Sequence, residues 1–260
     1  KDPGVLGEQK NDGREMSRKE SQNNVMKNLD GIIEKIENHI GEKEKIREDA
    51  LKASRDIIIW CRKGIQQLHR NQMAEAESFI NQAAAKLTQL YEITKDHADV
   101  FHSGYVENAA QEYVEIQCLY HIMKGMDLPD PDSIHTTYNA YLLGLCDVVG
   151  ELRRGALDFM LEGNTSKANE YLGYMDRIYD AIMSFDYPSA LVPIKKKQDM
   201  VRNLIEKTRG ELVVSSCERR IHEKAHEFHG LLDQVTEEKN TRRKTTDETD
   251  EEDIDIDKVW

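Results

Sequence analysis

The chain has 260 residues, enough for one large or two small domains, and none of its five prolines lies between Pro3 and Pro129. This scarcity of proline argues against a β-rich fold, and the 33% of charged and 7% of aromatic residues suit a bundle of amphipathic helices. No apolar run approaches the roughly 18 residues of a membrane span, so we expect no membrane association.

The formal net charge of −13 is unevenly distributed. Residues 245–260 contain eight acids and one lysine, and therefore carry −7 of it. The bases of the remaining chain are clustered, so the overall charge does not exclude an anionic partner such as nucleic acid. The four cysteines stand alone without CxxC spacing, which favours a reduced, cytoplasmic protein.

The first half of the chain predicts four helices. Residues 1–25 are polar and aperiodic, so we expect a disordered segment, part of which fits a tag. Helices should then cover 24–69, with a break near Gly41, followed by 73–95 and 98–124. A fourth helix should start at an Asp132 or Ser133 cap and run to Glu162, where Gly163-Asn164 is a stop signal.

The second half predicts three more helices, over 166–184, 194–209 and 211–235, with Gly210 separating the last two. Residues 237–260 should form a disordered acidic tail. The expected fold is therefore all-α, with a single seven-helix bundle domain over 26–236 between two disordered tails.

Two acidic runs lie inside the predicted third and fourth helices. The first is Glu112-Tyr113-Val114-Glu115, and the second runs from Asp147 to Glu151. Acids spaced by three or four residues share one helix face. The first pair should turn inward with Ile116, Leu119, Ile122 and Met123, leaving an outward arc of Val114, Gln117, Cys118 and His121.

The second pair should border an apolar stripe made by Leu145, Val148, Leu152, Ala156 and Phe159. Gly144 and Gly155 lie beside these acids and would let another helix approach closely. Inward carboxylates need proton sharing, salt bridges to Arg153 or Arg154, or a hard divalent cation. An all-oxygen site favours Mg²⁺ or Mn²⁺, and the interhelical salt bridge stays open as the structural alternative.

A basic stripe lines the predicted first helix. It consists of Lys52, Arg55, Arg62, Lys63 and Arg70. Such a row is typical of a solvated helix face, and equally of a track for nucleic-acid phosphates. Both interpretations remain open from the sequence.

Other motifs carry less weight. His222-Glu223-Lys224-Ala225-His226 fits the HExxH pattern of zinc peptidases, but no third ligand is suitably spaced, and a histidine-rich helix surface explains it equally well. The Glu-x-x-His motif of di-metal bundles is absent, because Cys118 and Arg154 stand where histidine is needed. No P-loop, GxGxxG or GxSxG occurs.

The acidic runs also carry a resemblance. Three stretches resemble the translin superfamily, and within it the branch of translin-associated factor X: QEYVEIQCLYHIM, YLLGLCDVVGELRR and RIYDAIMSFDYPSALVPIKKKQDMVRNLIEKTRGELVVSSCERR. The similarity runs from about Phe101 to Arg220 and more weakly back to Ile32. Because translin itself lacks the EYVE glutamates, this chain is similar to the catalytic type.

The resemblance implies an all-α, seven-helix subunit in an octamer-like hollow shell, either homo-oligomeric or formed with a translin-type subunit. It implies Mg²⁺-dependent endoribonuclease activity on single-stranded RNA, with some binding of single-stranded DNA. The implied catalytic and metal-binding residues are Glu112, Glu115, Asp147 and Glu151. Phe101-His102 matches a pair beside the family's nucleic-acid surface.

We therefore predict a Mg²⁺-dependent, or Mn²⁺-dependent, endoribonuclease in which the four acids hold the metal. The expected RNA-binding residues are Arg55, Arg62, Lys63, Arg70 and His102. The alternative is a non-catalytic RNA- or DNA-binding scaffold of translin type, whose acids only organise an interface.

Overall fold

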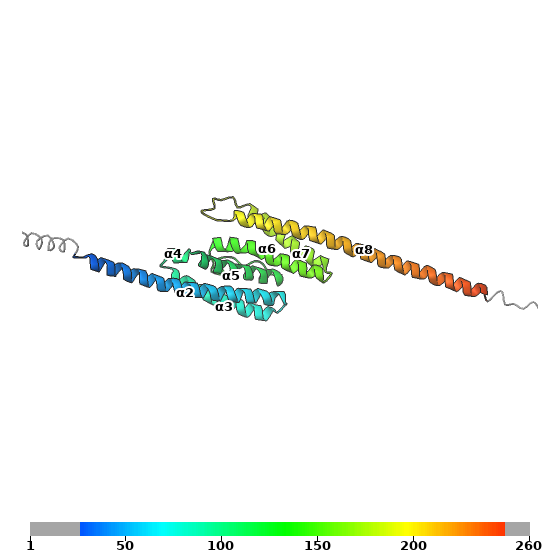
Figure 1. Cartoon of the computed structure of the whole chain (residues 1–260), viewed down its shortest axis with the longest axis horizontal. Coiled ribbons are helices and arrows are strands. Elements are labelled where there is room, and N and C mark those ends of the chain that lie inside the picture. The colour runs from blue at the N-terminus through cyan, green and yellow to red at the C-terminus, as the bar shows by residue number, and fades with distance from the viewer. Residues whose placement is uncertain (1–26, 248–260) are drawn as a thin grey trace, which may run out of the picture. The chain divides into compact units, whose positions relative to one another are not determined.

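The computed structural model describes residues 27–247, with side chains as far as 238. This part of the chain contains seven α-helices and no strand, so the predicted all-α fold is confirmed. The helices, shown in Figure 1, are α2 (Leu29–His69), α3 (Met73–Thr94), α4 (Ala98–Phe101), α5 (Gly104–Met123), α6 (Tyr138–Leu161), α7 (Thr165–Met183) and α8 (Lys195–Asp247).

Two compact units divide the chain, and their boundary falls inside α6, between Gly144 and Leu145. The predicted single domain over 26–236 stays a prediction. The predicted disordered segment 1–25 and the tail from 248 onward lie outside the described residues. None of the helices between 27 and 247 is both long enough and apolar enough to cross a bilayer.

In the first unit, α2 packs against α3 and α5, and α3 also contacts α5. The packed part of α2 is its second half, where buried apolar residues recur every three or four positions. The main buried side chains of this core are Ile57, Cys61, Leu68, Ile80, Leu87, Leu90, Ile116 and Leu119. The predicted break near Gly41 is wrong, because one glycine weakens a helix by only about 1 kcal/mol.

The predicted helix 98–124 is interrupted. α4 ends at Phe101, and Ser103 takes an extended conformation (φ −71°, ψ 146°) before α5 begins at Gly104. The Phe101 ring packs on Tyr91 of α3, with centroids 5.1 Å apart, and so fixes the short helix to its neighbour. A residue in the extended region followed by a glycine, which has no side chain to restrain it, allows the chain to turn here.

The fourth predicted helix begins later than expected. Asp130 Oδ1 accepts the N–H of Asp132 at 2.9 Å, and His135 has a positive φ of 52°, so residues 131–135 form turns. The cap of α6 is Thr137, whose Oγ1 accepts the N–H of Ala140 at 3.2 Å. The expected cap at Asp132 or Ser133 is wrong.

In the second unit, α7 packs against α8. The predicted stop at Gly163-Asn164 is confirmed, since Gly163 has φ 75° and Asn164 Oδ1 accepts the N–H of Lys167. The predicted stop at Gly210 is wrong, because α8 continues through it as one helix to Asp247. Residues 237–247 are therefore helical, contrary to the expected disordered tail.

Candidate active-site residues

The first acidic pair lies on α5 at the margin of the core of the first unit. Glu112 and Glu115 are both half-buried. The Glu112 side chain is 19% exposed, and its Oε1 lies 3.4 Å from Nη2 of Arg62 on α2. A cation from the basic stripe therefore reaches one of the predicted catalytic carboxylates.

The opposite arc of α5 is buried, so the prediction that Val114, Gln117 and Cys118 face outward is wrong. The first turns of α6 cover this side. A Cβ atom at Gly144 would lie 2.7 Å from the carbonyl oxygen of Gln111 and 2.8 Å from Cβ of Val114. Gly144 therefore permits the close helix approach that the sequence predicts.

The thiol of Cys61 on α2 lies close enough to the first acidic pair to be affected by its charge. Burial raises the pKa of its thiol well above the usual range, and the Glu112 and Glu115 carboxylates raise it further. A neutral thiol is a weak nucleophile. Cys61 is consequently a packing residue of the core, and the negative charge beside it comes from the two glutamates.

The second acidic pair borders the apolar stripe of α6, as predicted. The stripe residues Leu145, Val148, Leu152 and Ala156 are buried. Asp147 and Glu151, on the same helix, are half-buried at the edge of the stripe. Gly155 lies beside Tyr171 of α7, whose ring would be 2.7 Å from a Cβ atom at this position. The predicted close approach at Gly155 is confirmed.

Each acid of the second pair has a cationic partner. The Lys197 ammonium at the start of α8 donates to both oxygens of Asp147, and each side chain is 26% exposed. Glu151 Oε2 lies 3.6 Å from Nη1 of Arg154, which is itself 54% exposed. The predicted salt bridge to Arg154 is therefore present, on the same helix as Glu151.

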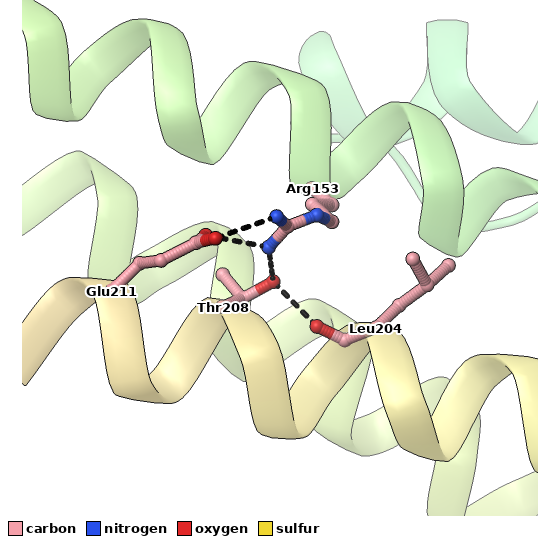
Figure 2. A network of polar contacts seen from close by, with 4 residues as sticks. All are labelled: Arg153, Leu204, Thr208 and Glu211. Atoms are coloured by element: carbon pink, nitrogen blue, oxygen red, sulfur yellow. Dashed lines mark hydrogen bonds and ion pairs between the residues drawn. The ribbon is translucent and has the colours of Figure 1, made fainter.

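Arg153 instead ties α6 to α8 (Figure 2). Its Nη1 donates to Thr208 Oγ1 at 2.8 Å, and its two terminal nitrogens donate to the Glu211 carboxylate at 2.7 and 2.9 Å. Thr208 Oγ1 in turn donates to the carbonyl oxygen of Leu204 at 2.7 Å. This two-point contact holds the Glu211 pKa below its usual range, first through the hydrogen bonds and then through the charge.

Lys197 is a partner of Asp147 that the sequence analysis does not predict. A signal was available in the run Lys195-Lys196-Lys197, which opens a helix where the dipole disfavours positive charge. Three lysines at such a position indicate that at least one serves another partner. The pKa of the neighbouring Cys146 thiol is raised to about 12, mainly by burial and also by the Asp147 charge, while the Lys197 charge opposes the rise.

The members of the basic stripe are all exposed on α2 or, for Arg70, at its C-cap. The Arg62 side chain is 70% exposed despite its contact with Glu112. His102 is also exposed, with its ring edge-on to Phe101 at 4.9 Å between centroids. These side chains are accessible to a polyanion.

The HExxH run lies on the exposed part of α8. His222, Glu223 and His226 are all exposed, and Glu223 lies 3.6 Å from Arg219 of the same helix. Between residues 27 and 247, no three or more His, Cys, Asp or Glu side chains are grouped so as to hold a metal ion.

The acids nevertheless fit a hard cation in their chemistry. All four supply oxygen donors from half-buried carboxylates, which is the ligand type that Mg²⁺ and Mn²⁺ prefer. Lys197 already places a positive charge between the two oxygens of Asp147. A divalent cation at Asp147 would have to share that carboxylate with Lys197 or displace it.

Residues 27–247 thus form seven helices that carry two half-buried acidic pairs and an exposed basic stripe. The model of the translin family matches residues 45–214. An uncharacterized protein of Methanocaldococcus jannaschii is 32% identical over 178 residues, which are 68% of this chain and 79% of the relative. The chain belongs to the translin family.

Solved structures agree with this assignment. The crystal structure of AfC3PO is 30% identical with a TM-score of 0.64, over 72% of this chain and 98% of that one. The structure of AfC3PO in complex with duplex RNA is also 30% identical to this chain, with a TM-score of 0.60, and the match covers 72% of this chain and 97% of that one. Apo-NeC3PO shares the fold, with a TM-score of 0.61 and 20% sequence identity. The match covers 72% of this chain and 97% of that one. The predicted translin-type fold is confirmed.

Proposed function

We propose that this protein binds RNA and cleaves it as a Mg²⁺-dependent endoribonuclease, with Glu112, Glu115, Asp147 and Glu151 as its catalytic carboxylates. The observation that carries the proposal is the pair of half-buried acidic runs, in which three acids already attract a cationic side chain. Membership of the translin family and the likeness to AfC3PO, solved with duplex RNA, support it.

The chain's own residues have distinct parts in this proposal. Arg55, Arg62, Lys63 and Arg70 neutralise phosphates and position the strand without reading its sequence. Mg²⁺ (or Mn²⁺) supplies the Lewis acid that polarises the scissile phosphate when it is bound. The carboxylates hold that cation, and one of them accepts the proton of the attacking water. We propose single-stranded RNA as the substrate, with single-stranded DNA bound more weakly.

We further propose that the chain assembles as translin-type subunits do, into an octamer-like shell of its own copies or with a second translin-type subunit. We also propose that it is of the translin-associated factor X type, and the EYVE glutamates Glu112 and Glu115 support this. Light scattering of the purified chain, alone and mixed with a translin-type subunit, distinguishes the two assemblies.

Cleavage of a labelled single-stranded RNA in Mg²⁺ and in EDTA tests the function. Asp147→Asn and Glu115→Gln should each abolish cleavage while RNA binding, followed by anisotropy, persists. The matched control is Asp158→Asn, which changes an exposed acid on the same helix as Asp147 and should leave cleavage unchanged. Equal cleavage in EDTA, or by both variants, would refute the proposal.

A second function has one observation in its favour. The direct pairing of Asp147 with Lys197 is what a purely structural acid would show. A non-catalytic RNA- or DNA-binding scaffold would then bind RNA without ever cleaving it, and Asp147→Asn would change stability alone. Running the duplex form of the same RNA beside the single strand shows which form is bound.

A further inference from the structure

The C-terminal part of α8 carries an exposed apolar seam. Val214, Ile221, Phe228 and Val235 are spaced by seven residues and are 57, 68, 59 and 49% exposed. Cys217, Lys224 and Leu231 are also exposed, and they follow Val214, Ile221 and Phe228 by three positions each. We call these seven residues together the α8 seam. Exposed apolar side chains in this number on one helix stripe indicate a contact surface.

The spacing of the α8 seam specifies the kind of partner. A straight α-helix has 3.6 residues per turn, so a strict seven-residue repeat stays on one stripe only if the helix supercoils with another. The seam covers 22 positions, or about 33 Å of helix. A helix with the same period therefore fits it.

Most of the α8 seam lies beyond the family match. The match ends at residue 214, so Val214 is the one seam residue within it. The match therefore does not identify a partner for the rest of the seam, and the seam's own spacing and charges have to specify it.

We propose that the α8 seam pairs with the α8 seam of a second copy of this chain, with the two helices antiparallel. In an antiparallel pair the seven-spaced positions of one helix face the intervening positions of the other. The layers are then Val214 against Leu231, Cys217 against Phe228, and Ile221 against Lys224, each repeated by the twofold axis. Five of these six residue types are apolar or weakly polar, and the Lys224 ammonium can extend past the layer to solvent.

Charge complementarity selects this arrangement. The exposed Arg220 and Glu227 flank the seam on one side, and antiparallel pairing sets Arg220 of each copy opposite Glu227 of the other. Lys224 Nζ already donates to Glu227 within the helix, at 2.6 Å. Each Glu227 would thus bind two cations, which offsets the charge of Lys224 in the seam.

The parallel alternative has the opposite electrostatics. In register it would set the two Lys224 ammonium groups against each other in the same layer. It would also place Arg220 opposite Ala225, which offers no acid. Like charges in a layer are destabilising, so the antiparallel pair is favoured.

Disulfide trapping in the full-length chain tests the pairing. Cys217 is exposed, whereas Cys61, Cys118 and Cys146 are buried. Phe228→Cys should place a thiol opposite Cys217 of the second copy, so mild oxidation with copper phenanthroline should give a cross-linked dimer on a non-reducing gel. The wild-type chain should stay uncross-linked, because its two Cys217 residues lie about 16 Å apart along the seam.

Phe228→Cys combined with Cys217→Ser is the control, and it should give no dimer. Cross-linking of the wild type through Cys217 would show a parallel pair, and absence of a dimer in Phe228→Cys would show that the seams do not meet. Either result overturns the proposal.

Charge reversal provides a second, independent measurement. In the Phe228→Cys chain, Arg220→Glu should weaken dimerisation about tenfold at low salt, because two attractive pairs become repulsive. Adding Glu227→Arg should restore it. Arg219→Glu is the matched control, since Arg219 pairs with Glu223 within its own helix and lies outside the seam. Failure of the double reversal to restore the yield would contradict the antiparallel register.

Discussion

The ammonium group of Lys197 lies between the two carboxylate oxygens of Asp147, and both side chains are largely shielded from solvent. The contact joins the first turn of α8 to α6 within the second unit. Desolvated ion pairs are costly to break from one side, because the remaining charge stays buried without its partner. Asp147 is therefore stabilised by Lys197 in the metal-free protein.

This relationship predicts that Lys197→Met destabilises the metal-free protein by about 1–3 kcal/mol. Urea denaturation in EDTA measures the change. The same variant should gain more stability from Mg²⁺ than the wild type does, because the cation then has no competitor at Asp147. Asp147→Asn should also destabilise the metal-free protein, but the double variant should lose less than the sum of the two.

Lys195→Met is the control for this experiment. Lys195 contacts Asp186 at 3.3 Å, but these side chains are 63% and 87% exposed. An exposed pair of this kind contributes little, so the unfolding midpoint should hardly move. If Lys197→Met behaved like Lys195→Met in both EDTA and Mg²⁺, the contact with Asp147 would have no energetic role.

Two glycines that look alike in the sequence should respond oppositely to alanine. Gly210 lies inside α8, and a Cβ atom there would meet nothing within 4 Å, so Gly210→Ala should stabilise the protein by about 0.5–1 kcal/mol. Gly163 ends α6 with φ 75°, so Gly163→Ala should destabilise it. Thermal unfolding of both variants decides the matter. If Gly210→Ala destabilised the protein instead, the result would support the helix end that the sequence predicts at Gly210.

The Glu211 carboxylate should make stability depend on pH. Its pKa is lowered in the folded protein, so its contribution is present above the usual glutamate range and is lost as the pH falls through the lowered value. The wild type should therefore exceed Glu211→Gln in urea midpoint at pH 7, and the difference should shrink toward pH 3. The effect is modest because the side chain is 43% exposed. A difference that is constant with pH would exclude an electrostatic origin.

Local patterns predict the helix bodies well. The apolar repeats place α3 and α7 within a residue of the observed ends, and Gly163-Asn164 marks a stop through hydrogen bonds made by neighbouring residues. The apolar stripe of α6 is also predicted, because one of its faces is buried and the other is not. These features depend on interactions within a few residues, which the sequence displays directly.

The features that the sequence does not predict depend on contacts between distant residues. α5 is buried on nearly all sides, so its apolar positions do not mark a single face, and the assignment of Cys118 to solvent fails. The pairing of Asp147 with Lys197 joins residues fifty positions apart, and helical spacing cannot reveal it. The approach of Arg62 to Glu112 depends in the same way on the packing of α2 against α5.

That approach gives two neighbouring basic residues different expected roles. Arg62 Nη2 lies 3.4 Å from Glu112 Oε1, whereas Lys63 is an exposed member of the same stripe. Lys63→Ala should weaken RNA binding and lower the slope of log affinity against log salt by about 0.7, the value for one lost phosphate contact on a single strand. Its cleavage rate at saturating RNA should not change.

Arg62→Ala should show the same loss of slope and, in addition, a lower rate at saturation, because Glu112 loses the cation that fixes its position. Arg62→Lys should recover the slope but only part of the rate, since lysine keeps the charge without the planar fork of arginine. Single-turnover cleavage, measured beside anisotropy at several salt concentrations, separates the two effects. Equal behaviour of Arg62→Ala and Lys63→Ala in both measurements would mean that the contact with Glu112 has no part in the chemistry.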